Sequence, residues 1–160
     1  MTNEQKNEYQ TFLEQKKQTR VESGFNVTES DLNPALFPFQ KYCVIRALAA
    51  GKFALFEDCG LGKTIQQLEW AQKVSQHIDR PVLILAPLAV ISQTVKEGEK
   101  FGYVVKEIGE TTFGEDLDTG IYITNYDNME HIDAYMFGGV VLDESSILKN
   151  FQGNIQNVNS

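Results

Sequence analysis

The chain has 160 residues, of which 42% are hydrophobic and 22% charged, and its net charge is −8 at pH 7. This length and composition predict one globular domain and exclude a disordered chain. No apolar run approaches the roughly 20 residues that a membrane-spanning helix needs, and the polar N-terminus lacks a signal-peptide core. We therefore expect a cytoplasmic protein without a membrane partner. Cys43 and Cys59 are too few for a disulfide framework and are expected to be free thiols.

The negative charge is concentrated in the second half of the chain. Residues 81–160 carry twelve acidic and four basic side chains, whereas residues 1–80 carry ten of each. An acidic half is a poor electrostatic footprint for nucleic acid. Any contact between this chain and nucleic acid is therefore expected to be local, or shared with another domain.

The predicted elements alternate between helices and strands along the chain. Residues 1–20 are typical of a mostly solvated helix, and residues 21–38 have the glycine, asparagine and proline content of a connecting loop. The patterns then predict, in order, a helix at 39–50, a strand at 53–56, a helix with Ile65, Leu68, Ala71 and Val74 inward, a strand at 82–86, a helix at 90–101, strands at 103–105 and 121–124, a short helix or loop at 127–135, and a strand at 139–143. This alternation predicts an α/β domain with a mostly parallel central sheet, helices on both faces and ligands at the carboxyl ends of the strands.

The stretch from Phe53 to Thr64 combines an apolar strand, a glycine loop and the start of a helix. In this arrangement the backbone N–H groups of the loop and the positive end of the helix point into one concavity, which suits a phosphate chain. Gly60 and Gly62 allow the backbone to approach an anion closely. Lys63 adds a positive charge, and the Thr64 hydroxyl is a candidate ligand of Mg²⁺.

Glu57 stands where the strict P-loop pattern has a glycine, which restricts the match to families with the short Gly-x-Gly-Lys-Thr form. The alternative interpretation is a glycine turn with an incidental lysine, and the flanking strand and helix argue against it. The residues expected to contact a nucleotide in this loop are Cys59, Gly60, Leu61, Gly62, Lys63 and Thr64.

The apolar strand at 139–143 ends in two carboxylates, Asp143 and Glu144. Unpaired acids are costly to bury, so a positive partner is expected at this strand end. Magnesium bound to a nucleotide is such a partner. Asp143 would hold the ion, and Glu144 would orient and deprotonate the water that attacks the γ-phosphate. The alternative is a strand end with solvated acids that leads into a helix at Ser145.

These motifs resemble motifs I and II of the Swi/Snf-like branch of superfamily 2 helicases and translocases. Three further segments resemble the one ahead of motif I, motif Ia and the segment near motif Ib. The stretches that carry the likeness follow the family's order: 36–40, 60–66, 86–90, 123–127 and 143–150. The forms most similar to them look like bacteriophage-encoded helicases, which places the protein in the cytoplasm of a host bacterium if it is phage-encoded.

The resemblance implies a RecA-like P-loop NTPase domain, the first ATP-binding lobe, at residues 36–150. Residues 1–35 precede it as a helix and connecting loop, residues 151–160 follow as a polar tail, and a second RecA-like lobe is expected to be missing from this chain. The implied cofactors are ATP and Mg²⁺, and the implied partner is nucleic acid, DNA in preference to RNA, held through its backbone phosphates.

The resemblance also assigns roles to single residues. Lys63 and Glu144 are implied as catalytic, and Thr64 and Asp143 as ligands of Mg²⁺. Gln40 is implied to read the adenine edge. The implied contacts to nucleic acid are Pro87, Ser92 and Asn125. Trp70 and the phenylalanines are expected in the core, with an adenine-flanking role for Phe37 or Phe39 as the alternative.

Two departures from the family qualify these expectations. Ser146 occupies the position of a histidine that helps to couple hydrolysis to the more distant motifs. The arginines that complete the ATP site belong to the second lobe, so this chain alone is expected to bind ATP–Mg weakly and to hydrolyse it very slowly. Two other functions stay open: a P-loop ATPase that acts on a protein partner without translocation, and a stand-alone nucleotide-binding module.

Overall fold

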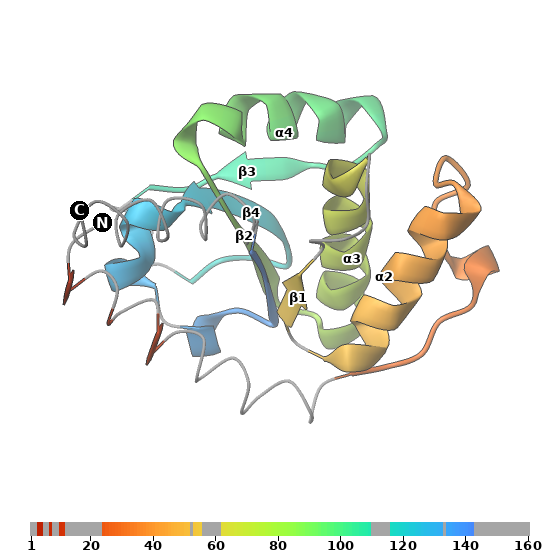
Figure 1. The fold of residues 1–160 in the computed structure, drawn as a ribbon, viewed down its shortest axis with the longest axis horizontal. Helices are drawn as coiled ribbons and strands as arrows, with labels where there is room; N and C mark the ends of the chain where they lie inside the picture. Colours follow the sequence, from red (N-terminus) through yellow and green to blue (C-terminus); the bar gives the residue numbers. More distant parts are fainter. Residues whose placement is uncertain are drawn as a thin grey trace, which may run out of the picture.

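The computed structural model describes residues 3–4, 7, 10–11, 24–51, 53–55, 62–109, 116–132 and 134–142. Within these residues, five strands form one sheet: β1 (Phe53–Leu55), β2 (Pro81–Ala86), β3 (Val105–Glu107), β4 (Gly120–Asn125) and β5 (Gly139–Leu142). All strand pairs are parallel, and the order across the sheet is β1-β5-β2-β4-β3 (Figure 1). The predicted α/β class with a parallel central sheet is therefore confirmed.

Three α-helices of the described residues pack on one face of this sheet: α2 (Pro38–Ala50), α3 (Lys63–Ile78) and α4 (Leu88–Lys100). In Figure 1, α2 lies beside α3, and both α2 and α4 contact it. The strand side chains on this face, such as Val82, Ile84 and Ile121, share one apolar core with the helices. Trp70 is fully buried in the same core, as the sequence predicts.

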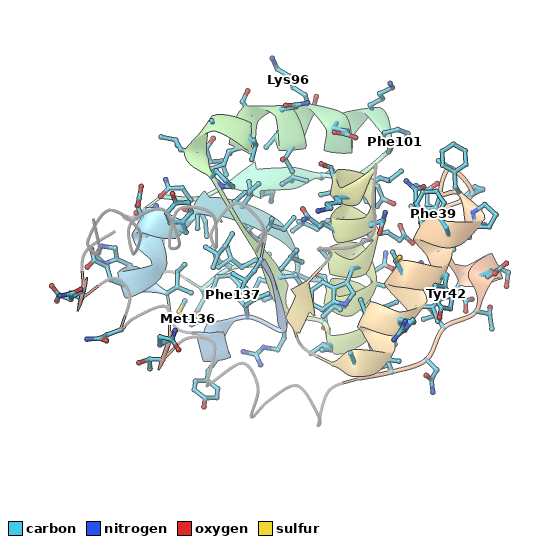
Figure 2. The ribbon with its side chains drawn as sticks, in the orientation of Figure 1. Phe39, Tyr42, Lys96, Phe101, Met136 and Phe137 are labelled. Atoms are coloured by element: carbon cyan, nitrogen blue, oxygen red, sulfur yellow. The ribbon has the colours of Figure 1, made fainter. Side chains whose placement is uncertain are left out.

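The second face of the sheet is also apolar. Leu83, Leu85 and Val140 alternate with the residues of the first face and are completely buried. In the described part of the chain, 3-10 helices cover this face: η3 (Tyr126–His131) contributes Tyr126, and η4 (Ala134–Met136) leads into the buried Phe137 (Figure 2). The continuous apolar runs seen in the sequence thus belong to strands buried on both sides.

The observed boundaries differ from the predicted ones by one or two residues at most helix ends and strands. α2 begins at Pro38, because a proline is favoured at the first helical position, and it ends at Ala50, with Gly51 as its C-cap at a φ of 123°. β3 begins two residues later than predicted, at Val105, because the N–H of Tyr103 bonds the carbonyl of Gly98 at 2.8 Å and still belongs to the end of α4.

Several predictions fall wholly or largely outside the described residues, including the helix over 1–20 and the polar tail at 151–160. The loop at 21–38 contains the 3-10 helix η1 (Glu29–Asp31). None of the helices in the described ranges has the length and apolar character that crossing a membrane requires. Cys43 is a free, half-buried thiol on α2.

A buried polar cluster ties the connecting loop to α3 and to the segment before β3. Glu69 of α3 is only 3% exposed, and its carboxylate accepts the Tyr103 hydroxyl and the backbone N–H of Asn33, the latter at 3.2 Å. The Asn33 amide Nδ2 donates to the Tyr103 hydroxyl at 3.1 Å and to the carbonyl of Phe101 at 3.3 Å. Because the buried carboxylate is satisfied in this way, it fixes three segments to one another.

Alkaline pH is expected to weaken this cluster. Burial and the hydrogen bond to Glu69 raise the pKa of Tyr103 above its ordinary value of 10.0. The folded protein therefore holds this proton more tightly than the unfolded chain, so the stabilisation is complete below pH 10 and declines above it, by at most about 1.4 kcal/mol per pH unit. Urea denaturation should show a steeper loss of unfolding free energy above that pH for the wild type than for Tyr103→Phe. Parallel pH profiles for the two proteins would contradict this account.

Candidate functional site

The ends of four neighbouring strands form one edge of the sheet, which we call the carboxyl edge. Leu142 at the end of β5 pairs with Leu55 at the end of β1 and with Leu85 in β2. Leu85 in turn pairs with Thr124 in β4. The predicted site segments follow these strand ends in the sequence: the glycine loop after β1, the acidic pair after β5, Pro87 after β2 and Asn125 at the end of β4.

The helix α3 runs from the carboxyl edge back to the opposite, amino edge. Near its C-terminus, the Ser75 hydroxyl donates to the carbonyl of Arg80 at 2.9 Å and lies 3.4 Å from the carbonyl of Gly120. Arg80 and Gly120 stand at the amino ends of β2 and β4. Because α3 has 16 residues and spans about 24 Å, its first residue, Lys63, lies toward the carboxyl edge.

The N-terminus of α3 has the properties of an anion-binding site. Gly62 caps the helix in the left-handed conformation, with φ of 83°. Lys63 and Thr64 in the first turn are both half-buried, and this turn carries no acidic side chain. The unpaired N–H groups and the positive end of the helix dipole therefore meet a lysine and a hydroxyl without a competing carboxylate in that turn. These residues fit a phosphate group and its magnesium ion.

Gln40 lies against the same helix end. It is 4% exposed, and its Oε1 accepts the backbone N–H of Phe37 at 2.8 Å. A Cβ added to Gly62 would lie only 2.1 Å from the Gln40 Nε2, so the amide group packs directly on the glycine. Two predicted site residues from separate segments of the sequence are thereby brought together.

Gly62→Ala is expected to lower the stability of the protein more than Gly102→Ala does. Both glycines have positive φ, where a side chain costs about 1–2 kcal/mol. A Cβ on Gly62 also collides with the Gln40 amide, whereas a Cβ on Gly102 meets nothing within 4 Å. Urea denaturation should give the larger loss of stability for Gly62→Ala, and ATP affinity should fall in this variant alone. Equal losses in the two variants would contradict the packing of Gln40 on Gly62.

Two of the three residues predicted to contact nucleic acid lie together at the carboxyl edge. Asn125 pairs in register with Ala86, and Pro87 follows Ala86 directly as the N-cap of α4. The Asn125 Oδ1 accepts the N–H of Asp127 at 3.0 Å, which orients the end of β4. Ser92 is exposed on the second turn of α4. The first turn of α4, directly after Pro87, carries no acidic side chain.

The two aromatic residues beside Gln40 differ from their predicted core role. Phe37 is 64% exposed and Phe39 is 50% exposed, and their nearly parallel rings lie 6.3 Å apart. In Figure 2, Phe39 and Tyr42 project from the outer side of α2. The prediction that these two phenylalanines lie in the core is therefore wrong. Pro38 begins α2 between them, and the buried face of α2 consists of Gln40, Val44 and Leu48.

Part of the predicted site lies outside the described residues. This applies to Cys59, Gly60 and Leu61 of the glycine loop and to the acidic pair Asp143 and Glu144. Their assigned roles stay predictions. Within the described ranges, no three His, Cys, Asp or Glu side chains gather as a metal site would require.

Two hollows lie away from the carboxyl edge. One is bordered by Ser75 and Gly120, and the other by Asp79 and Arg80. Both therefore open near the amino edge of the sheet. None of the predicted site residues in the described ranges lines either hollow.

A comparison with protein-family models finds none that matches the chain, and a comparison with curated proteins finds no match. The assignment of a function therefore depends on the sequence motifs and on the arrangement at the carboxyl edge.

Proposed function

We propose that the chain is the N-terminal, ATP-binding lobe of an ATP-dependent DNA helicase or translocase of the Swi/Snf-like branch of superfamily 2. The observation that carries this proposal is the pairing of Leu55 with Leu142. In the sequence, the glycine loop follows Leu55 and Asp143 follows Leu142, so the two motifs begin at the ends of neighbouring strands. P-loop ATPases need such motifs beside each other, because both act on one triphosphate and its metal ion.

Each residue of the site would have a separate task. The loop N–H groups and Lys63 would hold the phosphates, and Thr64 and Asp143 would hold Mg²⁺. When bound, the metal ion offsets the negative charge on the phosphate oxygens. Glu144 would orient the attacking water and accept its proton. Gln40, packed against Gly62, would bind the adenine edge.

In the proposed mechanism, ATP hydrolysis needs a second RecA-like lobe. That lobe would supply arginines to the γ-phosphate, and the two lobes would close around ATP and reopen after hydrolysis. The nucleic acid would be held through its phosphates by the N–H groups near Pro87, Ser92 and Asn125. Such contacts suit a chain with a net charge of −8, because they do not require a basic patch. We assign the protein to the cytoplasm.

The 160-residue chain is expected to bind ATP–Mg but to hydrolyse it far more slowly than a two-lobed protein. Loss of an arginine finger lowers the rate by about 10³ to 10⁵. Steady-state phosphate release should be measured for the purified chain, with and without a second RecA-like lobe supplied in trans or by fusion. A turnover of about one per second or more by the chain alone, unchanged by the added lobe, would refute this part of the proposal.

DNA dependence separates the proposed function from the alternatives. In the two-lobed protein, single- or double-stranded DNA should stimulate ATP hydrolysis, and the stimulation should fall as salt rises, because phosphate contacts release counterions. A P-loop ATPase that acts on proteins, or a stand-alone nucleotide-binding module, would bind ATP without this stimulation. ATP binding combined with hydrolysis that ignores DNA at every salt concentration would therefore overturn the assignment to helicases.

A further inference from the structure

Residues 25–40, which comprise the segment ahead of α2 and the first turn of α2, run alongside α3 in the opposite direction and contact it at three points. Phe25 stacks on His77 near the end of the helix, with ring centroids 3.8 Å apart. Asn33 bonds Glu69 in the middle, and Gln40 packs on Gly62 at the start. We call residues 33–40 the clasp, because both of its ends are attached to α3.

The first end of the clasp is held by the buried cluster. The Asn33 side chain donates to Tyr103 and Phe101, and its Oδ1 accepts the N–H of Ala35 at 2.9 Å. Its carbonyl accepts the N–H of Leu36 at 3.1 Å, and Leu36 is 4% exposed. Backbone, side chain and core packing therefore fix this end together, which leaves the clasp little freedom to shift.

The carboxylate of Glu69 makes this attachment rigid. It is 4% exposed at the side chain, accepts hydrogen bonds from Tyr103 and Asn33, and lies 3.9 Å from the ammonium group of Lys73. If one of these partners moved away, a desolvated polar group would be left without a hydrogen bond, which is energetically costly. Burial and Glu69 also raise the pKa of Tyr103, so its hydroxyl keeps the proton that it donates.

The second end of the clasp orients the Gln40 amide. Phe37 donates its N–H to Oε1 at 2.8 Å, which directs Nε2 toward Gly62. Pro38, at the first position of α2, fixes the backbone between them. Gln40 therefore lies in the first turn of a helix whose preceding segment is fixed at Asn33.

We propose that the cluster of Asn33, Glu69 and Tyr103 positions Gln40 and thereby sets the selectivity of the nucleotide site for adenine. This inference rests on the proposed function, in which Gln40 binds the adenine edge. Asn33, Glu69 and Tyr103 are positioning residues, because they act through the clasp. Lys63 and Thr64, which are expected to hold the phosphates, belong to α3 and not to the clasp.

The test compares three probes, each with Mg²⁺: ATP, GTP and inorganic tripolyphosphate. Their affinities are measured by isothermal titration calorimetry on the full chain and on Tyr103→Phe, Glu69→Gln and Gln40→Ala. The ratio of ATP affinity to GTP affinity should fall about tenfold in the two cluster variants and in Gln40→Ala. Tripolyphosphate affinity should stay within about twofold of the wild type in all of them.

Ser75→Ala is the matched control. The substitution removes the hydrogen bond that the Ser75 hydroxyl donates to the carbonyl of Arg80 at 2.9 Å, near the C-terminus of α3. Ser75 belongs to neither the clasp nor the cluster. Thermal denaturation checks that the control and the cluster variants lose similar stability. An equal loss of adenine selectivity in Ser75→Ala would attribute the effect to general destabilisation and overturn the inference.

The remaining outcomes separate the inference from the proposed function. Wild-type selectivity in both Tyr103→Phe and Glu69→Gln, with selectivity lost in Gln40→Ala, would overturn the role of the cluster and leave the proposed function intact. A wild-type chain that binds neither ATP nor tripolyphosphate would overturn the proposed function itself.

Discussion

Lys63→Ala is expected to abolish ATP binding by this chain. Lys63 begins α3 directly after Gly62, at the end of the helix that lies toward the carboxyl edge. Its ammonium group is the only cationic side chain in the first turn, and a charge-assisted hydrogen bond contributes about 1.5–3 kcal/mol. Losing such bonds to the phosphates should weaken ATP–Mg binding by about 100-fold or more, which calorimetry can measure directly.

Lys96→Ala is the control for this experiment. Lys96 is exposed on the outer side of α4, as Figure 2 shows, so its removal makes the same change in charge away from the proposed site. It should leave ATP affinity unchanged, and circular dichroism should show both variants folded. Wild-type ATP affinity in Lys63→Ala would mean that the N-terminus of α3 does not hold the phosphates.

Glu144→Gln is expected to keep ATP binding and to block hydrolysis in the two-lobed protein. The substitution preserves the shape of the side chain but removes the base that takes the proton of the attacking water. General base catalysis contributes about 10² to 10⁴ in rate, so turnover should fall by a factor in this range while ATP affinity changes little. Phosphate release and ATP titration on the same preparation measure the two quantities.

The matched control is Glu99→Gln, an exposed glutamate in the last turn of α4. It should change neither ATP affinity nor turnover. If Glu144→Gln instead lost ATP binding as completely as Lys63→Ala, the role assigned to Glu144 would be wrong. Its carboxylate would then belong to the binding site for the metal ion or to the fold.

The sheet could be predicted from the sequence because each central strand is buried on both faces. The runs at 82–86, 121–124 and 139–143 are almost continuously apolar, which is typical of strands buried on both faces. The observed β2, β4 and β5 coincide with these runs to within one residue at each end. The helical spacing of Ile65 and Leu68 predicts that both face inward, and both are buried in α3.

The contacts that complete the site could not be read from spacing. Gln40 is in α2 and Gly62 is the N-cap of α3, and Glu69 and Tyr103 are separated by 34 positions, so no local pattern links them. Hydrophobicity also gave a wrong prediction of burial for Phe37, which is exposed. The sequence does not distinguish an apolar side chain before a helix that packs inward from one that is exposed to solvent. Such features depend on how segments meet in three dimensions.

In the proposed site, one triphosphate and its metal ion are held at the carboxyl edge, between the start of α3 and the end of β5. Mn²⁺ in place of Mg²⁺ tests this directly, because bound Mn²⁺–ATP broadens the NMR signals of nearby amide groups. Broadening is expected at Lys63, Thr64 and Leu142, and sharp signals are expected at Asp79 and Gly120 near the amino edge. Broadening at Asp79 and Gly120, with Lys63 and Leu142 unaffected, would contradict it.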